Sequence, residues 1–190
     1  ELEMIQIIDD VFQAFKAKRS SYTIKLNSRV LVNTMLANLH LTDNQATAAV
    51  RLIDKVTKIS AEEFAHALDS ITGSKEVSKS IIELLSAKNI EELPYKLREN
   101  PSGKALHNVL EACKALGIRN VEFDISLMRG FDYYTDIVFE VFDNDPDNNR
   151  SMFGGGRYDG LVAQFGADPV PTIGFGMGDV TFQDFLETHK

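Results

Sequence analysis

Cysteine is scarce in this sequence, because Cys113 is the only one among 190 residues. A single cysteine excludes a disulfide framework and a cluster of thiols around zinc. No paired metal-ligand spacing is present among the four histidines, which are His40, His66, His107 and His189. We therefore expect no protein-bound metal, and we expect the protein to work in a reducing cytoplasm.

Long apolar stretches are absent too. No run approaches the roughly 20 residues that a bilayer-spanning helix needs, and no charged-then-apolar leader opens the chain, so we expect no membrane association. At 190 residues the chain suits one domain, or a core with a smaller second unit. It begins at Glu1 inside a helical pattern, from which we expect further residues of the same protein upstream.

Positive charge is in the minority, since 20 Lys and Arg stand against 28 Asp and Glu. The net charge of −8 disfavours a polyanionic partner, least so at residues 42–118, where the two signs nearly balance. Arg51, Lys55 and Lys58 fall there at spacings of four and three, as a phosphate-contacting helix stripe would. Asp54 interrupts the stripe, and this interruption favours the alternative of a solvated face.

Hydrophobic periodicity predicts an α+β core that carries an all-α insertion. Strands are expected at 22–26, 121–125, 137–142, 151–155 and 172–177. Helices are expected at 2–18, 28–39, 43–57, 60–72, 75–88, 102–116, 158–165 and 181–189. These elements divide the chain into a first core segment at 1–41, a helical insertion at 42–118 and a second core segment at 119–190.

Local signals mark several helix ends. Ser60 and Glu63 have the spacing of a capping box, which predicts the start of a helix. Gly73 and Gly117 stand where helices are expected to stop. Asn27 or Ser28 is expected to cap the helix that follows the first strand.

The segment Leu127-Met-Arg-Gly-Phe-Asp-Tyr-Tyr-Thr135 joins two predicted strands and is rich in chemical groups. It combines a fixed cation at Arg129, a carboxylate at Asp132 and phenols at Tyr133 and Tyr134. Loops on a rigid sheet are common places for binding sites. If the segment is extended, neighbouring side chains point to opposite faces, and one of the two tyrosines at most faces a given pocket. The alternative is a surface ion pair with both tyrosines in the core.

Two further segments are rich in glycine. Phe153-Gly-Gly-Gly-Arg-Tyr-Asp-Gly-Leu161 lacks Cβ atoms over three residues, which allows close approach of a ligand or of another backbone. In Thr172-Ile-Gly-Phe-Gly-Met-Gly-Asp179, glycine recurs every second residue and leaves one face of a strand bare, where a flat ring such as adenine fits. The alternative for the first pattern is a tight bend, and the alternative for the second is close packing of a helix or a second strand.

Together these segments resemble histidyl-tRNA synthetases. Residues 127–135, followed by Val138-Phe-Glu140, resemble the first histidine motif of that family, and Gly155-Gly-Arg-Tyr-Asp-Gly-Leu161 is similar to the second. Residues 174–178 look like the strand of class II motif 3. The resemblance is strong over 124–188 and rests on the pattern of elements over 1–118. It implies part of the class II antiparallel sheet flanked by helices.

The resemblance implies a reaction and a set of roles. The family joins histidine to ATP as histidyl-adenylate and then transfers histidine to its tRNA, with Mg²⁺ accompanying ATP. Arg129 would contact the histidine carboxylate and the ATP α-phosphate, where a permanent charge stabilises the transition state. Tyr134 and Tyr158 would bind the imidazole, with Tyr133 as a neighbouring candidate. Gly174, Gly176 and Gly178 would form the surface of the sheet on which ATP binds.

The resemblance also implies partners and shows two departures. The intact enzyme would be a homodimer, and its insertion would contact tRNA-His through Arg51, Lys55 and Lys58. Class II motif 3 has a Glu-Arg pair after its glycine strand, but here Asp179-Val-Thr181 follows, so no ATP-binding arginine is assigned there. Nothing resembles motif 1, motif 2 or an anticodon-binding domain, and we expect these 190 residues alone to be inactive.

The main alternative is non-catalytic. The regulatory subunit of ATP phosphoribosyltransferase is a paralogue that senses histidine and shares the fold and much of both histidine motifs. The long helical insertion and the Gly-Asp-Val-Thr ending at residues 178–181 favour a synthetase. A scaffold that keeps the fold without binding histidine is the third possibility.

Overall fold

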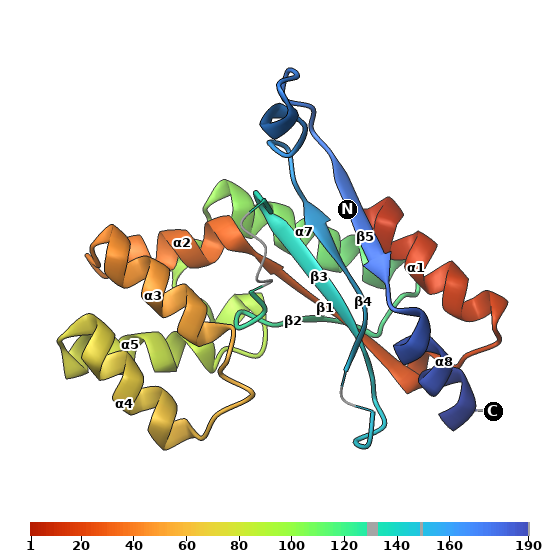
Figure 1. Cartoon of the computed structure of the whole chain (residues 1–190), viewed down its shortest axis with the longest axis horizontal. Helices are drawn as coiled ribbons and strands as arrows, with labels where there is room; N and C mark the ends of the chain where they lie inside the picture. Colours follow the sequence, from red (N-terminus) through yellow and green to blue (C-terminus); the bar gives the residue numbers. More distant parts are fainter. Residues whose placement is uncertain (129–132, 149, 190) are drawn as a thin grey trace.

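The structure, a computed structural model, is organised around one five-stranded sheet (Figure 1). It describes residues 1–128, 133–148 and 150–189. Within these residues the strands are β1 (Tyr22–Ser28), β2 (Val121–Phe123), β3 (Ile137–Asp143), β4 (Ser151–Arg157) and β5 (Ile173–Met177). The order and mixture of strands and helices confirm the predicted α+β class.

Helices flank the sheet and fill the stretch between β1 and β2. The α-helices are α1 (Leu2–Ala14), α2 (Arg29–Asn38), α3 (Asp43–Ile53), α4 (Ala61–Thr72), α5 (Lys75–Leu85), α6 (Tyr95–Arg98), α7 (Pro101–Ala115) and α8 (Asp179–Thr188). Short 3₁₀ helices are η1 (Arg19–Ser21), η2 (Ile90–Glu92) and η3 (Val162–Phe165). In the described part of the chain, no helix combines the length and apolarity needed to cross a bilayer.

The strands lie in the order β2–β1–β3–β4–β5. Neighbouring strands are antiparallel, except for β1 and β2, which are parallel. The sequence predicted an antiparallel sheet, and the parallel pairing of β1 with β2 differs from that prediction. Parallel neighbours need a long crossover connection, and here the helices from α2 to α7 provide it.

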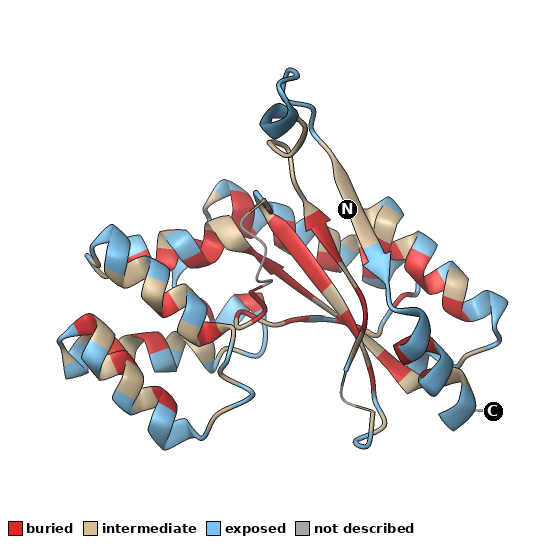
Figure 2. Cartoon of the chain, in the orientation of Figure 1, coloured by how far each residue is buried: buried red, intermediate tan, exposed pale blue. Residues whose placement is uncertain are grey.

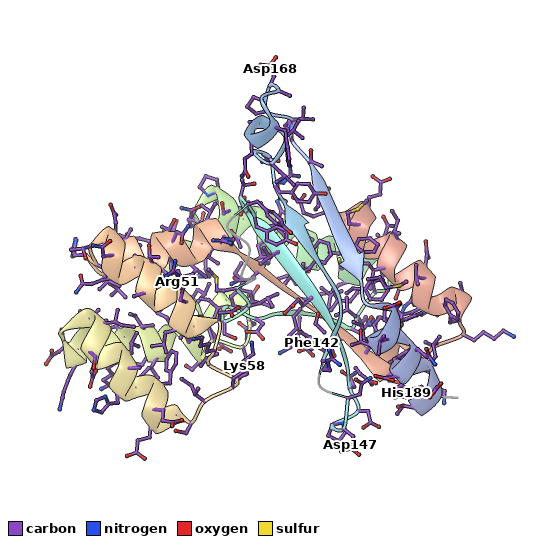
Figure 3. All side chains as sticks on the ribbon, viewed as in Figure 1. Arg51, Lys58, Phe142, Asp147, Asp168 and His189 are labelled. Carbon is purple, nitrogen blue, oxygen red and sulfur yellow. The ribbon has the colours of Figure 1, made fainter. Side chains whose placement is uncertain are left out.

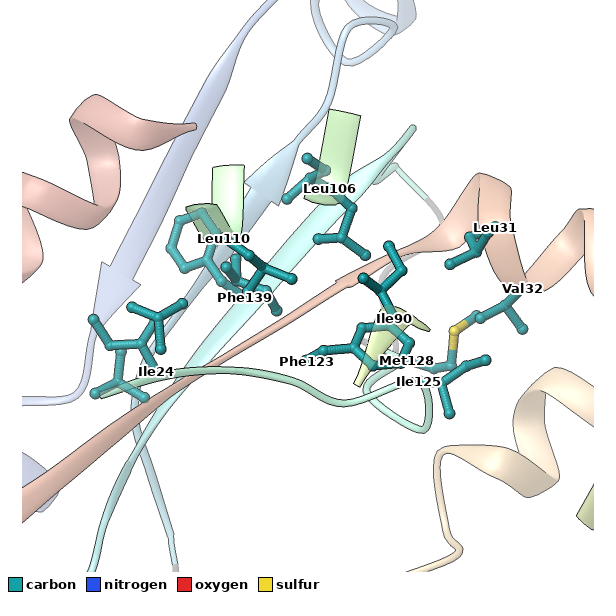
Figure 4. Packing of buried hydrophobic residues seen from close by; sticks show 14 of the residues in the cluster. Ile24, Leu31, Val32, Ile90, Leu106, Leu110, Phe123, Ile125, Met128 and Phe139 are labelled. Carbon is teal, nitrogen blue, oxygen red and sulfur yellow. The ribbon is translucent and has the colours of Figure 1, made fainter. Parts of the chain in front are cut away.

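One face of the sheet is apolar and buried. Side chains alternate along a strand, so Ile24, Leu26 and Phe139 point to the same side, where each is fully buried. Helices α1, α7 and α8 cover this side. Figure 4 shows Leu106 and Leu110 of α7 packed near Phe139, and Figure 2 shows buried residues along β1, β3 and β4.

The opposite face is polar on β1 and β3 and bare on β4 and β5. Lys25 and Glu140 are direct cross-strand partners on this polar face. Over the next two strands, two successive cross-strand pairs on the same face consist only of glycine. The molecule thus has a covered apolar face and a polar face with little side-chain bulk at one end.

Helices α3, α4 and α5 form a helical unit beside the sheet (Figure 1). The predicted capping box of Ser60 and Glu63 begins α4, and a second one begins α3 at Thr42. Gly73 ends α4 with a left-handed φ of 69°, as expected. Helix α7 belongs to the stretch 42–118 but packs on β1 and β2. The division of the chain at 42 and 118 stays a prediction.

Some elements are shorter than periodicity indicates, because local hydrogen bonds replace the regular pattern. Helix α3 ends at Ile53, and the N–H of Lys55 bonds to a carbonyl only three residues back. Strand β2 ends at Phe123, since the Asp124 carboxylate accepts the N–H of Ser126 and starts a turn. Of the helix expected at 158–165, the structure contains only η3.

A buried carboxylate joins α1 to β1. Asp9 is 2% exposed and accepts a hydrogen bond of 2.5 Å from the Tyr22 hydroxyl. Arg19 donates to the same carboxylate through Nε at 3.0 Å and through Nη2 at 2.6 Å. Burial first, and then the bond to Asp9, raise the pKa of Tyr22. The Tyr22 ring also stacks on Phe12 with a centroid distance of 3.8 Å.

Replacing Asp9 by Asn should therefore destabilise the fold. The substitution keeps the size of the side chain but removes the charge that Arg19 and Tyr22 donate to. We expect the free energy of unfolding to fall by about 1–3 kcal/mol, measured by urea denaturation. Asp10→Asn is the matched control, since Asp10 is exposed on the same helix. Equal effects of the two substitutions would contradict the role of Asp9.

Candidate functional site

Three tyrosines meet beside the glycine pairs of the polar face. Tyr133 and Tyr134 precede β3, and Tyr158 follows β4. The ring centroid of Tyr133 lies 4.6 Å from that of Tyr134 and 5.9 Å from that of Tyr158. The centroids of Tyr134 and Tyr158 are 6.3 Å apart. The structure therefore brings together all three tyrosines singled out in the sequence, and we call them the tyrosine cluster.

The alternation expected for Tyr133 and Tyr134 does not hold. That expectation assumed strand geometry, but residues 133–136 form a turn and irregular backbone ahead of β3. Both rings consequently contact Tyr158. Tyr134 is buried against Leu127 and Val138, whereas the other two tyrosines are partly exposed.

Hydrogen bonds beside the tyrosines tie their two segments together. The N–H of Thr135 donates to the carbonyl of Arg157 at 2.8 Å, and its hydroxyl accepts the N–H of Asp159 at 3.2 Å. Thr172 accepts the N–H of Tyr158 at 2.8 Å and donates its own N–H to the Asp159 carboxylate at 3.2 Å. The backbone on each side of the cluster is thus fixed from both directions.

Arg157 and Asp159 are site residues that the sequence did not single out. The Arg157 guanidinium donates to Asp159 at 3.1 Å and to Glu1 at 2.6 Å. The bond to Glu1 is the largest contribution that raises the pKa of Arg157. Opposite charges on either side of Tyr158 were the available signal, and they indicate an ion pair that orients the end of β4.

The three glycines that the sequence predicts along the ATP site, Gly174, Gly176 and Gly178, differ in their surroundings. Gly176 is exposed, and a Cβ added to it would meet no atom within 4 Å. A Cβ on Gly178 would lie 2.6 Å from the hydroxyl of Thr181 in α8. Gly174 lies beneath the phenol of Tyr158. Only Gly176 therefore offers open space to a ligand, and the ATP-binding role of the three glycines stays a prediction.

Arg129 and Asp132 lie outside the described residues. The described backbone just before them is held by Asn27, which is fully buried in β1. Its amide Nδ2 donates to the carbonyls of Ile125 at 2.8 Å and Leu127 at 3.0 Å. Sequence reasoning considered Asn27 only as a helix cap. The missed signal was an amide side chain within a strand. A buried amide is almost always hydrogen-bonded, so its presence indicates a neighbouring segment that it holds.

A cavity of about 1030 Å³ separates the polar face of the sheet from the end of α3 and the segment after it. Lys25, Glu140 and Phe142 line it on the side of the sheet, and Lys58 lines it on the side of the helical unit. Figure 3 shows Lys58 between the helical unit and the sheet. The cavity is large enough for a nucleotide-sized ligand.

Arg51, Lys55 and Lys58 do not form the expected stripe on one helix. Because α3 ends at Ile53, only Arg51 belongs to it. Figure 3 shows Arg51 on α3 and Lys58 beyond its end. Of the three basic residues, only Lys58 is among those that line the cavity. All three are exposed, and their binding to RNA stays a prediction.

The polar face contains a paired charge beside the cavity. Lys25 Nζ lies 2.8 Å from Asp124 Oδ2 and 5.4 Å from the centre of the Phe142 ring. Burial alone would raise the pKa of Asp124, but hydrogen bonds from Lys25 and Ser126 outweigh it and hold the pKa below its usual value. Asp124 is therefore a stable anion that neutralises Lys25.

Neither a metal centre nor a reactive thiol is found in the described residues. Among them, no group of three or more His, Cys, Asp or Glu side chains is arranged to hold a metal ion. Burial raises the pKa of Cys113 to about 11, so its thiol stays protonated at neutral pH. The chemistry that the described site offers is binding by phenols, backbone and charge.

Two solved structures share this fold over nearly the whole chain. A histidyl-tRNA synthetase from Nostoc sp. PCC 7120 superposes with a TM-score of 0.86 at 23% identity, over 98% of this chain and 46% of that one. An ATP phosphoribosyltransferase regulatory subunit/histidyl-tRNA synthetase from Bacillus halodurans gives 0.78 at 22% identity, over 100% of this chain and 49% of that one. At these identities the likeness establishes the fold.

Sequence comparison establishes the family. The family model described as histidyl-tRNA synthetase matches residues 1–178. A histidine--tRNA ligase from Leptospira biflexa is 34% identical over the whole chain, which spans 44% of that protein. One from Thermoplasma volcanium is 31% identical over 88% of the chain and 40% of its own length. The chain belongs to the histidyl-tRNA synthetase family and spans less than half the length of these relatives.

The Lys25–Asp124 pair predicts a pH dependence of stability. Because the pKa of Asp124 is lowered in the fold, its carboxylate stabilises the folded state above its ordinary pKa, and this contribution is lost as the pH falls through the lowered value. Asp124→Asn should therefore flatten the loss of stability that begins below about pH 5, as the pH falls through the ordinary pKa of the carboxyl and then through its lowered value. Denaturant unfolding at each pH measures this.

The control for this measurement is Asp168→Asn. Asp168 is exposed at the tip of the loop before β5, so the same change of charge occurs far from Lys25 (Figure 3). The control should follow the wild-type acid dependence. An Asp124→Asn variant that lost stability as steeply as the wild type would show that the pair does not contribute.

Proposed function

We propose that the complete gene product is a histidine--tRNA ligase. The observation that carries the proposal is the tyrosine cluster beside the bare end of the polar face, built from the two segments that resemble the histidine motifs. A phenol hydroxyl both donates and accepts hydrogen bonds, and its ring packs against another flat ring. An imidazole matches both features, because its ring nitrogens donate or accept hydrogen bonds and its ring is flat.

In the first step, a histidine carboxylate oxygen attacks the α-phosphorus of ATP. A new P–O bond forms, the bond to the bridging oxygen of the β-phosphate breaks, and pyrophosphate leaves. Tyr134 and Tyr158, with Tyr133 beside them, hold the imidazole. Arg129 neutralises the carboxylate and the charge that develops on the α-phosphate. In the second step, a ribose hydroxyl at the 3′ end of the tRNA attacks the carbonyl carbon of histidyl-adenylate. A new ester bond forms, the bond from that carbon to the phosphate oxygen breaks, and AMP leaves.

The nucleotide occupies the open surface at Gly176 of β5, with Gly174 on the same strand and Gly178 directly after it, and Mg²⁺ accompanies ATP as part of the substrate. The cavity between the sheet and the helical unit supports this placement, because Lys25 and Glu140, which line it, lie on the same face of the sheet as Gly176. The helical insertion contacts tRNA-His through Arg51, Lys55 and Lys58. The intact enzyme is a homodimer that works in the cytoplasm.

The alternative function is a histidine-sensing regulatory subunit of ATP phosphoribosyltransferase. It is favoured by the likeness in fold to the Bacillus halodurans protein, which is described as such a subunit or a histidyl-tRNA synthetase. The two functions differ in one reaction. A ligase exchanges pyrophosphate into ATP when histidine is present, whereas a sensor binds histidine without exchange.

Exchange by the complete gene product separates these functions. Histidine-dependent exchange of pyrophosphate into ATP supports the ligase. Histidine binding without exchange supports the regulatory subunit, and absence of histidine binding excludes both.

Arg129→Ala in the complete gene product tests the role of the guanidinium. Loss of a preorganised charge at the reacting phosphate should lower the rate of adenylate formation by about 100-fold or more, measured by single-turnover kinetics. Arg119→Ala is a matched control, because it removes the same charge ahead of β2. A decrease below about threefold for Arg129→Ala would show that the role is misassigned.

Tyr158→Phe tests the assignment of the tyrosine cluster. The substitution removes one hydroxyl and keeps the ring, so it should raise the KM for histidine about three- to tenfold and leave the KM for ATP nearly unchanged. Tyr95→Phe is the matched control, because Tyr95 is exposed on α6. Equal changes in both KM values would indicate a general effect on the fold and contradict the assignment.

A further inference from the structure

Two glycines face each other across the strands that carry the proposed site. Gly156 of β4 and Gly174 of β5 are direct partners in the antiparallel ladder, so their missing side chains point to the same face. A Cβ built on Gly156 would lie 2.9 Å from a ring carbon of Tyr134. A Cβ built on Gly174 would lie 2.4 Å from the hydroxyl oxygen of Tyr158. Each glycine therefore lies directly under one tyrosine.

The two positions differ in what else surrounds them. A Cβ on Gly156 would also lie 2.6 Å from the backbone carbonyl of Ile137, and one on Gly155 would lie 2.3 Å from the carbonyl of Gly174. Backbone atoms of a sheet cannot move away without breaking the ladder. At Gly174 the three nearest atoms all belong to Tyr158, and the nearest of them is the far end of its side chain. Only there can the clash be relieved by moving a side chain of the site.

We propose that Gly174 is a positioning residue for Tyr158, and that the absence of a side chain at 174 sets how closely the phenol approaches the sheet. This inference rests on the proposed function, since it takes Tyr158 as part of the histidine pocket. It assigns Gly174 to the amino-acid side of the site, and it leaves Gly176, two residues further along the same face, as the open surface for the nucleotide.

Alanine at 174 moves the phenol without removing it. To regain an ordinary contact of 3.4 Å from the present 2.4 Å, the hydroxyl oxygen has to shift by about 1 Å. The backbone on both sides of Tyr158 is hydrogen-bonded to Thr172 and Thr135, so the side chain yields and the strand does not. The hydroxyl then no longer reaches the position from which it binds the imidazole.

A double-mutant cycle on the complete gene product tests the inference. Gly174→Ala should raise the KM and the dissociation constant for histidine about three- to tenfold, with those for ATP within about twofold. In a Tyr158→Phe background the same alanine should change histidine affinity by less than about twofold. The reason is that the removed hydroxyl was the clashing atom, and the next ring carbon is already 3.4 Å away.

Two matched glycine variants control for the substitution itself. A Cβ on Gly160 meets no atom within 4 Å, so Gly160→Ala should leave histidine affinity unchanged. Gly176→Ala places the same methyl group on the same strand in open space, so it should alter the KM for ATP and not that for histidine. Calorimetric titration with histidine alone and with ATP alone measures binding independently of turnover.

The outcomes separate the inference from the function on which it rests. If Tyr158→Phe weakens histidine binding and Gly174→Ala does nothing, or if the two effects multiply, the positioning role is overturned and the proposed function stands. If Tyr158→Phe leaves histidine binding unchanged, the proposed role of the tyrosine fails, and the role of Gly174 fails with it. Sub-additive effects confined to histidine support the inference.

Discussion

The structure depends on the burial of one face of a five-stranded sheet while the other face stays accessible. Helices α1, α7 and α8 cover the apolar face, where each fully buried Ile, Leu or Phe contributes about 1.5–3 kcal/mol. With stability supplied from that side, the opposite face is free to carry charge and glycine. Glycine costs stability within a strand, and its repeated use in β4 and β5 is consistent with a face shaped for close approach.

Backbone hydrogen bonds convert that face into a defined site. The tyrosines come from segments more than twenty residues apart, and the bonds of Thr135 to Arg157 and Asp159 bring the segments together. Thr172 then fixes the end of β4 against the start of β5. On the other side, Asn27 holds the backbone that leads toward residue 129. Strands and turns preorganise the described groups.

Local features of the sequence were predictable, and long-range ones were not. The capping box at Ser60 and the helix stop at Gly73 depend on neighbouring residues, and the structure has both. The parallel pairing of β1 and β2 depends on a crossover of more than ninety residues, which no local pattern encodes. The period-two glycines predicted a bare strand face, but their different surroundings depend on what lies opposite, such as the Tyr158 hydroxyl over Gly174. The amide of Asn27 was missed for the same reason.

The tyrosine cluster and the neighbouring glycine pairs are together proposed to form a histidine pocket. A crystal structure of the complete gene product with bound histidine tests this proposal most directly. We predict an imidazole in contact with the rings of Tyr134 and Tyr158, beside the backbone of Gly156 and Gly174. Histidine bound elsewhere, for instance in the cavity beside Lys58 with the tyrosine cluster unoccupied, would contradict it.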